Sequence, residues 1–237
     1  MAGHSKWAQI KRGKGVADQK RSAVFSKLAS GISIAARQGT DPEMNFQLRI
    51  AIDKAKAANM PKDNIERAIE RAKGAGGSGL EEIIFEAYGP AGTAFIIETA
   101  TDNRNRTIGD VRAVLNKYGG KLAEAGSVGY LFKKRGLIIL SEANEAAELA
   151  AIEAGAEDFS ELDGKLFVYT APTELENVRQ KLQTATFVPS EISFELEPTV
   201  TIPISDPDLA KKVIKLSETL DEVDDVTNVA SNFEISS

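Results

Sequence analysis

Four cations and one aromatic residue occupy the first fourteen positions of the chain. Lys6, Lys11, Arg12 and Lys14 surround Trp7, with almost no apolar residue nearby to build a core. Such cations can neutralise phosphate charge, and an indole ring offers a flat surface for base stacking, so the segment has the chemistry of a nucleic-acid-binding arm. A solvated basic tail whose Trp7 packs on the body of the protein fits the same residues. Both interpretations stay open.

Charge is distributed unevenly along the chain. Residues 1–77 contain fifteen Lys/Arg and seven Asp/Glu, whereas residues 78–237 contain fourteen and twenty-eight, so a formal net charge of −6 hides a strongly dipolar molecule. A basic end of this kind is suited to a polyanionic partner, and an acidic remainder repels one. Further cations extend the predicted nucleic-acid-binding footprint through the basic region: Lys20, Arg21, Lys62 and Arg67.

A second candidate binding segment, residues 101–107, lies between a predicted strand and a predicted helix. Asn105 or Thr107 is expected to cap the helix. Arg104 and Arg106 would then lie beside the exposed N–H groups at the helix start, where an anion such as a phosphate binds favourably. We favour anion binding. The alternative is that the arginines pair with neighbouring carboxylates: Asp102, Asp110 or Glu98.

The composition argues against several classes of enzyme. The chain has no cysteine and a single histidine, His4. It therefore cannot form disulfides or thiolate sites, and most zinc sites and Ser-His-Asp arrangements are excluded. No apolar run reaches the length of a membrane span. We expect a cytoplasmic, non-enzymatic protein without cofactor or metal, present as a monomer or weak oligomer and not bound to membranes.

Hydrophobic periodicity divides the chain into helical and mixed regions. Three short helices with narrow apolar stripes are predicted before the glycine-rich stretch Gly74–Gly79, which is typical of a linker. Beyond it, runs of apolar residues alternate with helical spacing. The predicted strands include 83–85, 93–97, 127–132, 137–140, 166–169, 191–196, 199–204 and 226–233, and the predicted helices 107–118, 144–154, 172–183 and 206–220.

This pattern predicts an α+β protein of three domains. The first domain, residues 1–77, contains the basic arm and three helices. The last helix and strand need a sheet to pack against, so residues 200–237 are predicted to join residues 80–134 in a discontinuous domain. Residues 135–199 would form an inserted domain. Both α+β domains are expected to have a small ferredoxin-like arrangement with split β-α-β units.

Several motifs in order along the chain resemble those of the YebC/PmpR family. The resemblance extends from the first residues to the last strand, with Arg37–Thr40 standing where a Gly-Gly pair is usual and Ala91 where Gly is usual. The segments that carry it are Ala2–Trp7, Asn59–Ile69, Tyr88–Pro90, Thr101–Thr107 and Gly126–Val128.

The resemblance implies a three-domain α/β regulator of gene expression. Bacterial members of the family are described as DNA-binding transcriptional regulators, which implies DNA as the partner. The organellar relatives are translational activators of cytochrome oxidase, which implies the alternative of a ribosome-associated translation factor that binds ribosomal or messenger RNA. The residues themselves favour binding to the phosphate backbone and do not separate duplex DNA from RNA.

Overall fold

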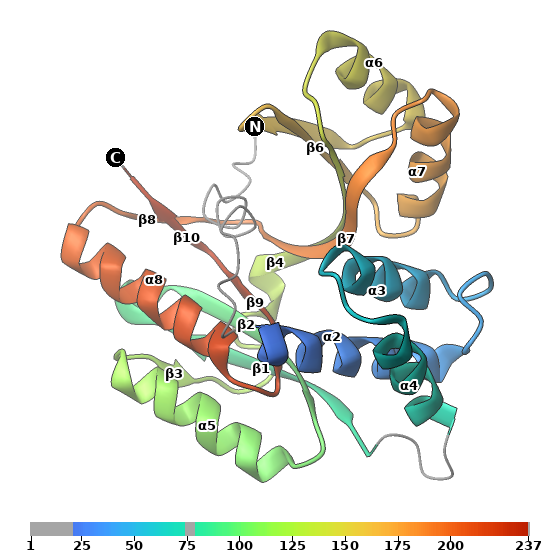
Figure 1. The fold of residues 1–237 in the computed structure, drawn as a ribbon. Coiled ribbons are helices and arrows are strands. Elements are labelled where there is room, and N and C mark those ends of the chain that lie inside the picture. The colour runs from blue at the N-terminus through green and yellow to red at the C-terminus, as the bar shows by residue number, and fades with distance from the viewer. Residues whose placement is uncertain (1–20, 74–78, 237) are drawn as a thin grey trace. The chain divides into compact units, whose positions relative to one another are not determined.

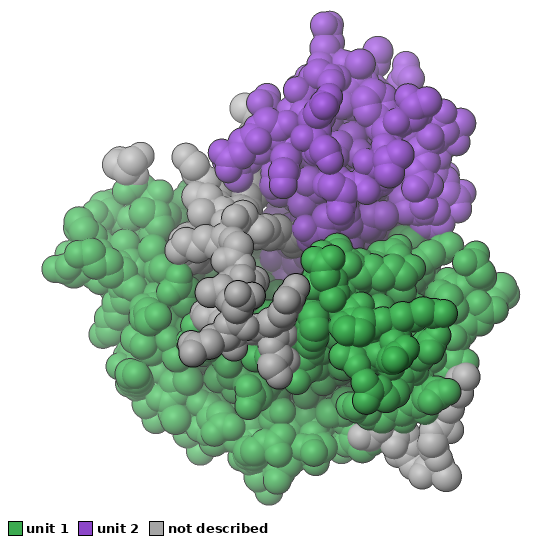
Figure 2. Space-filling model, viewed as in Figure 1, with its two compact units in different colours: residues 1, 3–132, 198–237 green, residues 2, 133–197 purple. Residues whose placement is uncertain are grey.

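The computed structural model describes residues 21–73 and 79–236, which fall into two compact units, green and purple in Figure 2. Unit 1 contains the described residues up to Phe132 together with those from Pro198 onward, and unit 2 contains Lys133–Glu197. Unit 2 is therefore an insertion in the sequence of unit 1. The further division of unit 1 into a helical and an α+β domain stays a prediction.

The N-terminal part of unit 1 is helical. Its apolar residues recur at three- and four-residue spacing, which places Ile32, Leu48 and Ile65 in one buried cluster. Asn45 joins the helices, because its side-chain oxygen accepts from the Leu48 N–H (3.1 Å) and its amide donates to the Ala35 carbonyl (2.7 Å). The elements are α2 (Arg21–Ala35), η2 (Ala36–Gln38), α3 (Phe46–Ala57) and α4 (Lys62–Lys73).

The rest of unit 1 is a four-stranded sheet with the order β3-β1-β2-β9 and a separate parallel pair of β8 with β10. Helices α5 and α8 pack on the sheet (Figure 1), and side chains such as Phe95, Leu115 and Leu216 form one buried core between them. The elements are β1 (Glu81–Tyr88), η3 (Pro90–Gly92), β2 (Ala94–Thr101), α5 (Arg104–Lys117), β3 (Lys121–Leu122), η4 (Gly129–Leu131), β8 (Ile202–Ile204), α8 (Pro207–Glu222), β9 (Val226–Ser231) and β10 (Phe233–Ile235).

The connections in this sheet differ from those of a standard ferredoxin-like domain. Strand β1 is antiparallel to both β2 and β3, so β2-α5-β3 is a split β-α-β unit with β1 between its two strands. Strand β9 lies on the other side of β2 and is antiparallel to it. The spatial order is the ferredoxin-like one, but β1 precedes the first split unit in the chain. The predicted pairing of the C-terminal strand with this sheet is what the structure has.

Ala91, in the turn between β1 and β2, adopts a left-handed backbone conformation with φ 58° and ψ 20°. An L-residue with a Cβ is strained there by about 1–2 kcal/mol, whereas glycine is not. We expect Ala91→Gly to raise the free energy of unfolding by about 1 kcal/mol, less than the full strain because glycine loses more entropy on folding. Urea denaturation would measure it.

A matched control for this prediction is Ala113→Gly on the exposed side of α5. The same replacement in a helix interior should destabilise the protein by about 1 kcal/mol. Destabilisation by Ala91→Gly as well would show that the turn does not hold this strained conformation in solution.

Unit 2 has the connections of a ferredoxin-like domain. Its chain runs β-α-β-β-α-β with the strand order β5-β6-β4-β7, and β6 is antiparallel to both β4 and β5. Helices α6 and α7 lie against this sheet (Figure 1), and a Cβ on Gly136 would lie 2.9 Å from the side chain of Leu175 in α7. The elements are β4 (Phe132–Leu140), α6 (Glu145–Ala154), β5 (Asp158–Leu162), β6 (Lys165–Thr170), α7 (Leu175–Thr184) and β7 (Pro189–Pro198).

The α+β fold class is confirmed, but two local predictions were wrong. The strand expected at 127–132 is a turn followed by η4, because Gly126 and Gly129 lie in a loop held by Glu86. Strand β5 was missed, since its sequence DFSEL carries acids at two of five positions. Within the described residues, no helix combines the length and the apolarity needed to span a membrane.

Candidate nucleic-acid interface

The start of α5 is fixed by Asn103, one turn earlier than expected. Its side-chain oxygen accepts from the Arg106 N–H (3.1 Å), so Asn103 is the N-cap in place of Asn105 or Thr107. Arg104 and Arg106 therefore lie in the first turn of the helix and not in a loop before it. The short polar side chain of asparagine suits this position because it can satisfy a helix N–H that has no partner within the helix.

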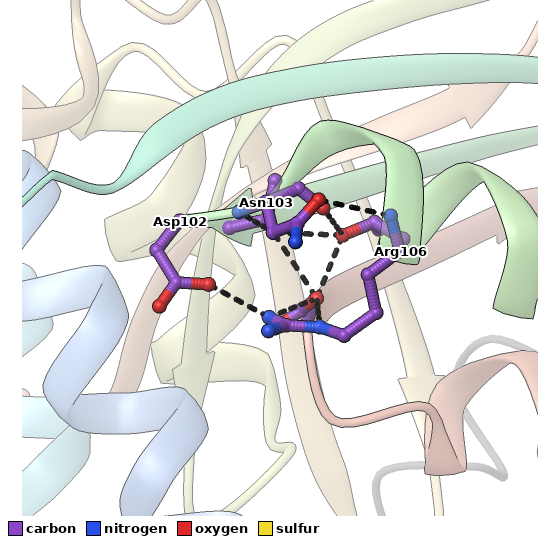
Figure 3. A network of polar contacts seen from close by, with 6 residues as sticks. Asp102, Asn103 and Arg106 are labelled. Carbon is purple, nitrogen blue, oxygen red and sulfur yellow. Dashed lines mark hydrogen bonds and ion pairs between the residues drawn. The ribbon is translucent and has the colours of Figure 1, made fainter.

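Arg106 is held by two carboxylates (Figure 3). Its guanidinium donates to Asp102 Oδ1 (2.8 Å) and to both oxygens of Asp225 (3.0 and 2.9 Å). Asp225 lies in the turn between α8 and β9, and its side chain is 14% exposed. The carboxylate alternative considered for the arginines therefore applies to Arg106, with Asp225 as a partner far away in the sequence.

Asp225 also joins the end of β2 to α5. The hydroxyls of Thr107 and Thr101 donate to its Oδ2 at 2.6 and 3.1 Å. Burial on its own would raise the pKa of Asp225, but the hydrogen bonds from Thr107, Arg106 and Thr101 outweigh it and hold the pKa below its ordinary value. The network fixes the first turn of α5 against the sheet, and with it the position of Arg104.

Exposed cations follow the length of α5. Arg104 and Arg112 make no ion pair within the part of the chain that the structure describes. Near the end of the helix Lys117 lies over the Tyr118 ring (5.5 Å), and Lys212 of α8 reaches to within 3.1 Å of where a Gly119 Cβ would stand. Asp102 is already paired with Arg106, whereas Asp110 on α5 is a further exposed carboxylate. Exposed cations therefore lie at both ends of α5 and along its length.

The predicted site residues on α4 have local partners. Lys62 lies 3.3 Å from Glu66, but its side chain is 87% exposed, so the pair is weak. The Nε of Arg67 donates to the Asp63 carbonyl (3.1 Å), and its guanidinium contacts Asn64. Both cations face solvent and stay available to an anion.

Other predicted contributors are placed differently. Lys6, Trp7, Lys11, Arg12, Lys14 and Lys20 lie outside the described residues, and Arg21 is the first residue of α2. Among the described residues, no hydrogen bond or ion pair connects the side chains of α4 with those of α5, so the α4 and α5 cations are not part of one contact network.

Arg135 and Lys133 are two further cations in the middle part of the chain. Both lie in unit 2, where they pair with Glu157 at 3.1 and 3.5 Å, and Arg135 also contacts Glu197. These two cations are therefore neutralised locally. Sequence reasoning gave no particular role to Arg112 or Asp225. Helical spacing from Arg104 would have pointed to Arg112, but no local signal pointed to Asp225.

Two family profiles together cover nearly the whole chain. The family described as "TACO1/YebC protein N-terminal domain" matches residues 5–75, and the one described as "TACO1/YebC second and third domain" matches residues 80–233. The chain belongs to the TACO1/YebC family. The resemblance drawn from the sequence motifs is thereby confirmed.

Relatives of known sequence or structure align with this TACO1/YebC chain from end to end. A "probable transcriptional regulatory protein" of Deinococcus radiodurans is 48% identical over 99% of this chain and 98% of its own. One of a Synechococcus strain is 49% identical over 99% and 96%. The crystal structure of a conserved hypothetical protein of Aquifex aeolicus superposes with a TM-score of 0.90 at 44% identity, covering 98% of both chains.

Proposed function

We propose that this chain is a non-enzymatic regulator of gene expression that binds nucleic acid, with duplex DNA as its partner. The observation that carries the proposal is the positive charge of Arg104 and Arg112 on α5, which are exposed and make no ion pair with any residue that the structure describes. It is supported by the excess of fifteen Lys/Arg over seven Asp/Glu in residues 1–77. The names of the relatives from Deinococcus radiodurans and Synechococcus support a regulatory role.

Phosphate binding would use the two ends of α5 differently. Arg104 lies in the first turn, where the helix dipole and free N–H groups attract an anion. Asp225 neutralises Arg106 in the same turn, so Arg104 is the arginine of this turn that would bind phosphate. At the far end Lys117 and Lys212 supply point charges without a fixed hydrogen-bonding geometry. A helix of fourteen residues is about 21 Å long, enough to follow several phosphates of a duplex.

Base contacts would come from one stripe of the same helix. Asn105, Arg112 and Asn116 are exposed and recur at seven- and four-residue steps, so they share a face of α5. Gly109 lies among them, and a Cβ at this position would meet no described atom outside its own helix within 4 Å, which leaves room for close approach. Asparagine and arginine are the side chains that read adenine and guanine edges in a major groove. We infer that α5 is the element that enters the groove.

We expect Arg104→Ala/Arg112→Ala to weaken binding to a fluorescein-labelled DNA duplex and to reduce the salt dependence of binding. Loss of the Arg104 phosphate contact should lower the slope of log K against log salt by about 0.9, whereas loss of Arg112, on the base-contacting stripe, should weaken binding with a smaller effect on the slope. Fluorescence anisotropy between about 50 and 200 mM salt measures both quantities. The double variant should fold normally, since both side chains are exposed.

The matched control is Lys165→Ala/Lys211→Ala, which removes two exposed cations, one from unit 2 and one from α8. It should leave the slope unchanged. Equal slopes for all three proteins would remove α5 from the interface. Purified ribosomes, added as competitor, distinguish DNA from ribosomal RNA as the partner. Transfer of the protein from the labelled duplex to the ribosomes at about physiological salt would contradict DNA as the partner.

A further inference from the structure

Helix α6 of unit 2 buries one face and leaves two aliphatic side chains in solvent. Its alanines pack inward, whereas Leu149 and Ile152 are 56% and 58% exposed. Single exposed aliphatic residues are common on protein surfaces, but these two lie one turn apart and are continuous with exposed Ala146. The buried alanine face already packs the helix in its unit, so folding does not account for the exposed apolar stripe.

Carboxylates flank this stripe. Glu145 lies one turn before Leu149 and Glu153 one turn after it, and neither makes an ion pair within the described residues. The negative charge of Glu145 in the first turn is stabilised by the helix dipole, whereas Glu153 lies in the last turn, where negative charge is unfavourable. Near this end Lys181 of α7 donates to the Ala154 carbonyl (3.2 Å). Glu153 therefore keeps a free charge at some cost to the helix.

We propose that the exposed face of α6 binds a basic amphipathic helix of another protein. An apolar stripe flanked by glutamates complements a partner helix whose aliphatic stripe is flanked by lysine or arginine. Nucleic acid and anionic lipid would both be repelled by this face. A second copy of this chain, packed symmetrically through α6, would bring glutamates against glutamates. Unit 2 as a whole has thirteen Asp/Glu and six Lys/Arg, which steers a basic partner toward it.

The test uses the full chain and a labelled synthetic helix of about 18 residues, long enough to be partly helical alone, with a leucine stripe flanked by lysines. Wild type should bind this peptide and should not bind a version with glutamate in place of every lysine. Leu149→Ser/Ile152→Ser should weaken binding about tenfold, since two apolar contacts are lost. Glu145→Gln/Glu153→Gln should weaken it by a similar factor and also flatten its salt dependence.

Two exposed glutamates of unit 1 provide the matched control. Glu43→Gln/Glu124→Gln makes the same change of charge in the other unit and should leave peptide affinity unchanged. Equal affinity of wild type and both α6 variants would overturn the proposal, as would binding of the two peptides with equal strength. Concentration-dependent association of the wild type alone, lost in Leu149→Ser/Ile152→Ser, would identify a second copy as the occupant and overturn it too.

Discussion

Asp225→Ala is expected to lower the free energy of unfolding by about 3 kcal/mol. The side chain is 14% exposed and accepts hydrogen bonds from Arg106, Thr101 and Thr107. Truncation removes the hydrogen bonds from all three residues and leaves two threonine hydroxyls, both in buried residues, without this acceptor. Arg106 contributes less to the loss, because its side chain is 48% exposed and can be hydrated when the carboxylate is gone.

Denaturation in urea, followed by circular dichroism, measures this loss. The matched control is Asp224→Ala, a change of the same type at the exposed neighbouring residue, which should stay within about 0.5 kcal/mol of wild type. A double-mutant cycle of Asp225→Asn with Arg106→Gln should give a coupling energy of about 1 kcal/mol. Equal losses at Asp224 and Asp225, or a coupling energy of zero, would show that the network in Figure 3 does not stabilise the protein.

The Asp225 network also predicts how the stability of the protein depends on pH. The pKa of Asp225 is held below its ordinary value, because the hydrogen bonds from Thr107, Arg106 and Thr101 outweigh the effect of burial. Its contribution to stability is therefore complete above the unfolded pKa of about 3.9 and is lost as the pH falls through the lower folded pKa. The stability gap between wild type and Asp225→Asn should narrow below about pH 4. A constant gap would exclude a charge effect.

The elements of this fold could largely be predicted from local pattern. Apolar spacing in residues 21–73 predicts helices because each helix buries one stripe, and the cluster around Leu48 and Ile65 is that stripe. The return of the C-terminal strand to the first sheet also follows from a local argument, since a lone helix and strand cannot bury their apolar faces. The boundaries were less accurate where a polar residue decides them, as at Asn103.

The candidate site was harder to predict, because its electrostatics depend on contacts between distant parts of the sequence. Arg104 and Arg106 look equivalent in the sequence, yet Arg104 has no ion pair among the described residues, whereas Arg106 is held by Asp225 from a turn more than a hundred residues later. The same holds for Arg135, whose partners Glu157 and Glu197 lie in another part of the chain. Which cations are free is a property of the fold.

Glu86→Ala is expected to cost about 3 kcal/mol, for a reason the sequence does not show. The Glu86 carboxylate accepts from the backbone N–H groups of Gly126 (2.6 Å), Val128 (2.6 Å) and Gly129 (2.8 Å). Charge-assisted bonds of this kind are stronger than neutral ones, and without them the N–H group of buried Val128 has no other acceptor in the described structure. Glu86→Gln keeps one acceptor oxygen and should lose about half as much.

Glu82→Gln is the matched control, an exposed glutamate on the same strand β1, and should stay within about 0.5 kcal/mol of wild type. Burial on its own would raise the pKa of Glu86, but the three N–H groups of Val128, Gly126 and Gly129 outweigh it and lower the pKa. The stabilisation is then complete above about pH 4.3 and lost as the pH falls through the folded pKa.

Hydrogen exchange at Val128 gives a local readout of the same bonds. Glu86→Gln should speed it at neutral pH, whereas unchanged exchange alongside lower stability would mean that Glu86 acts elsewhere than on this loop.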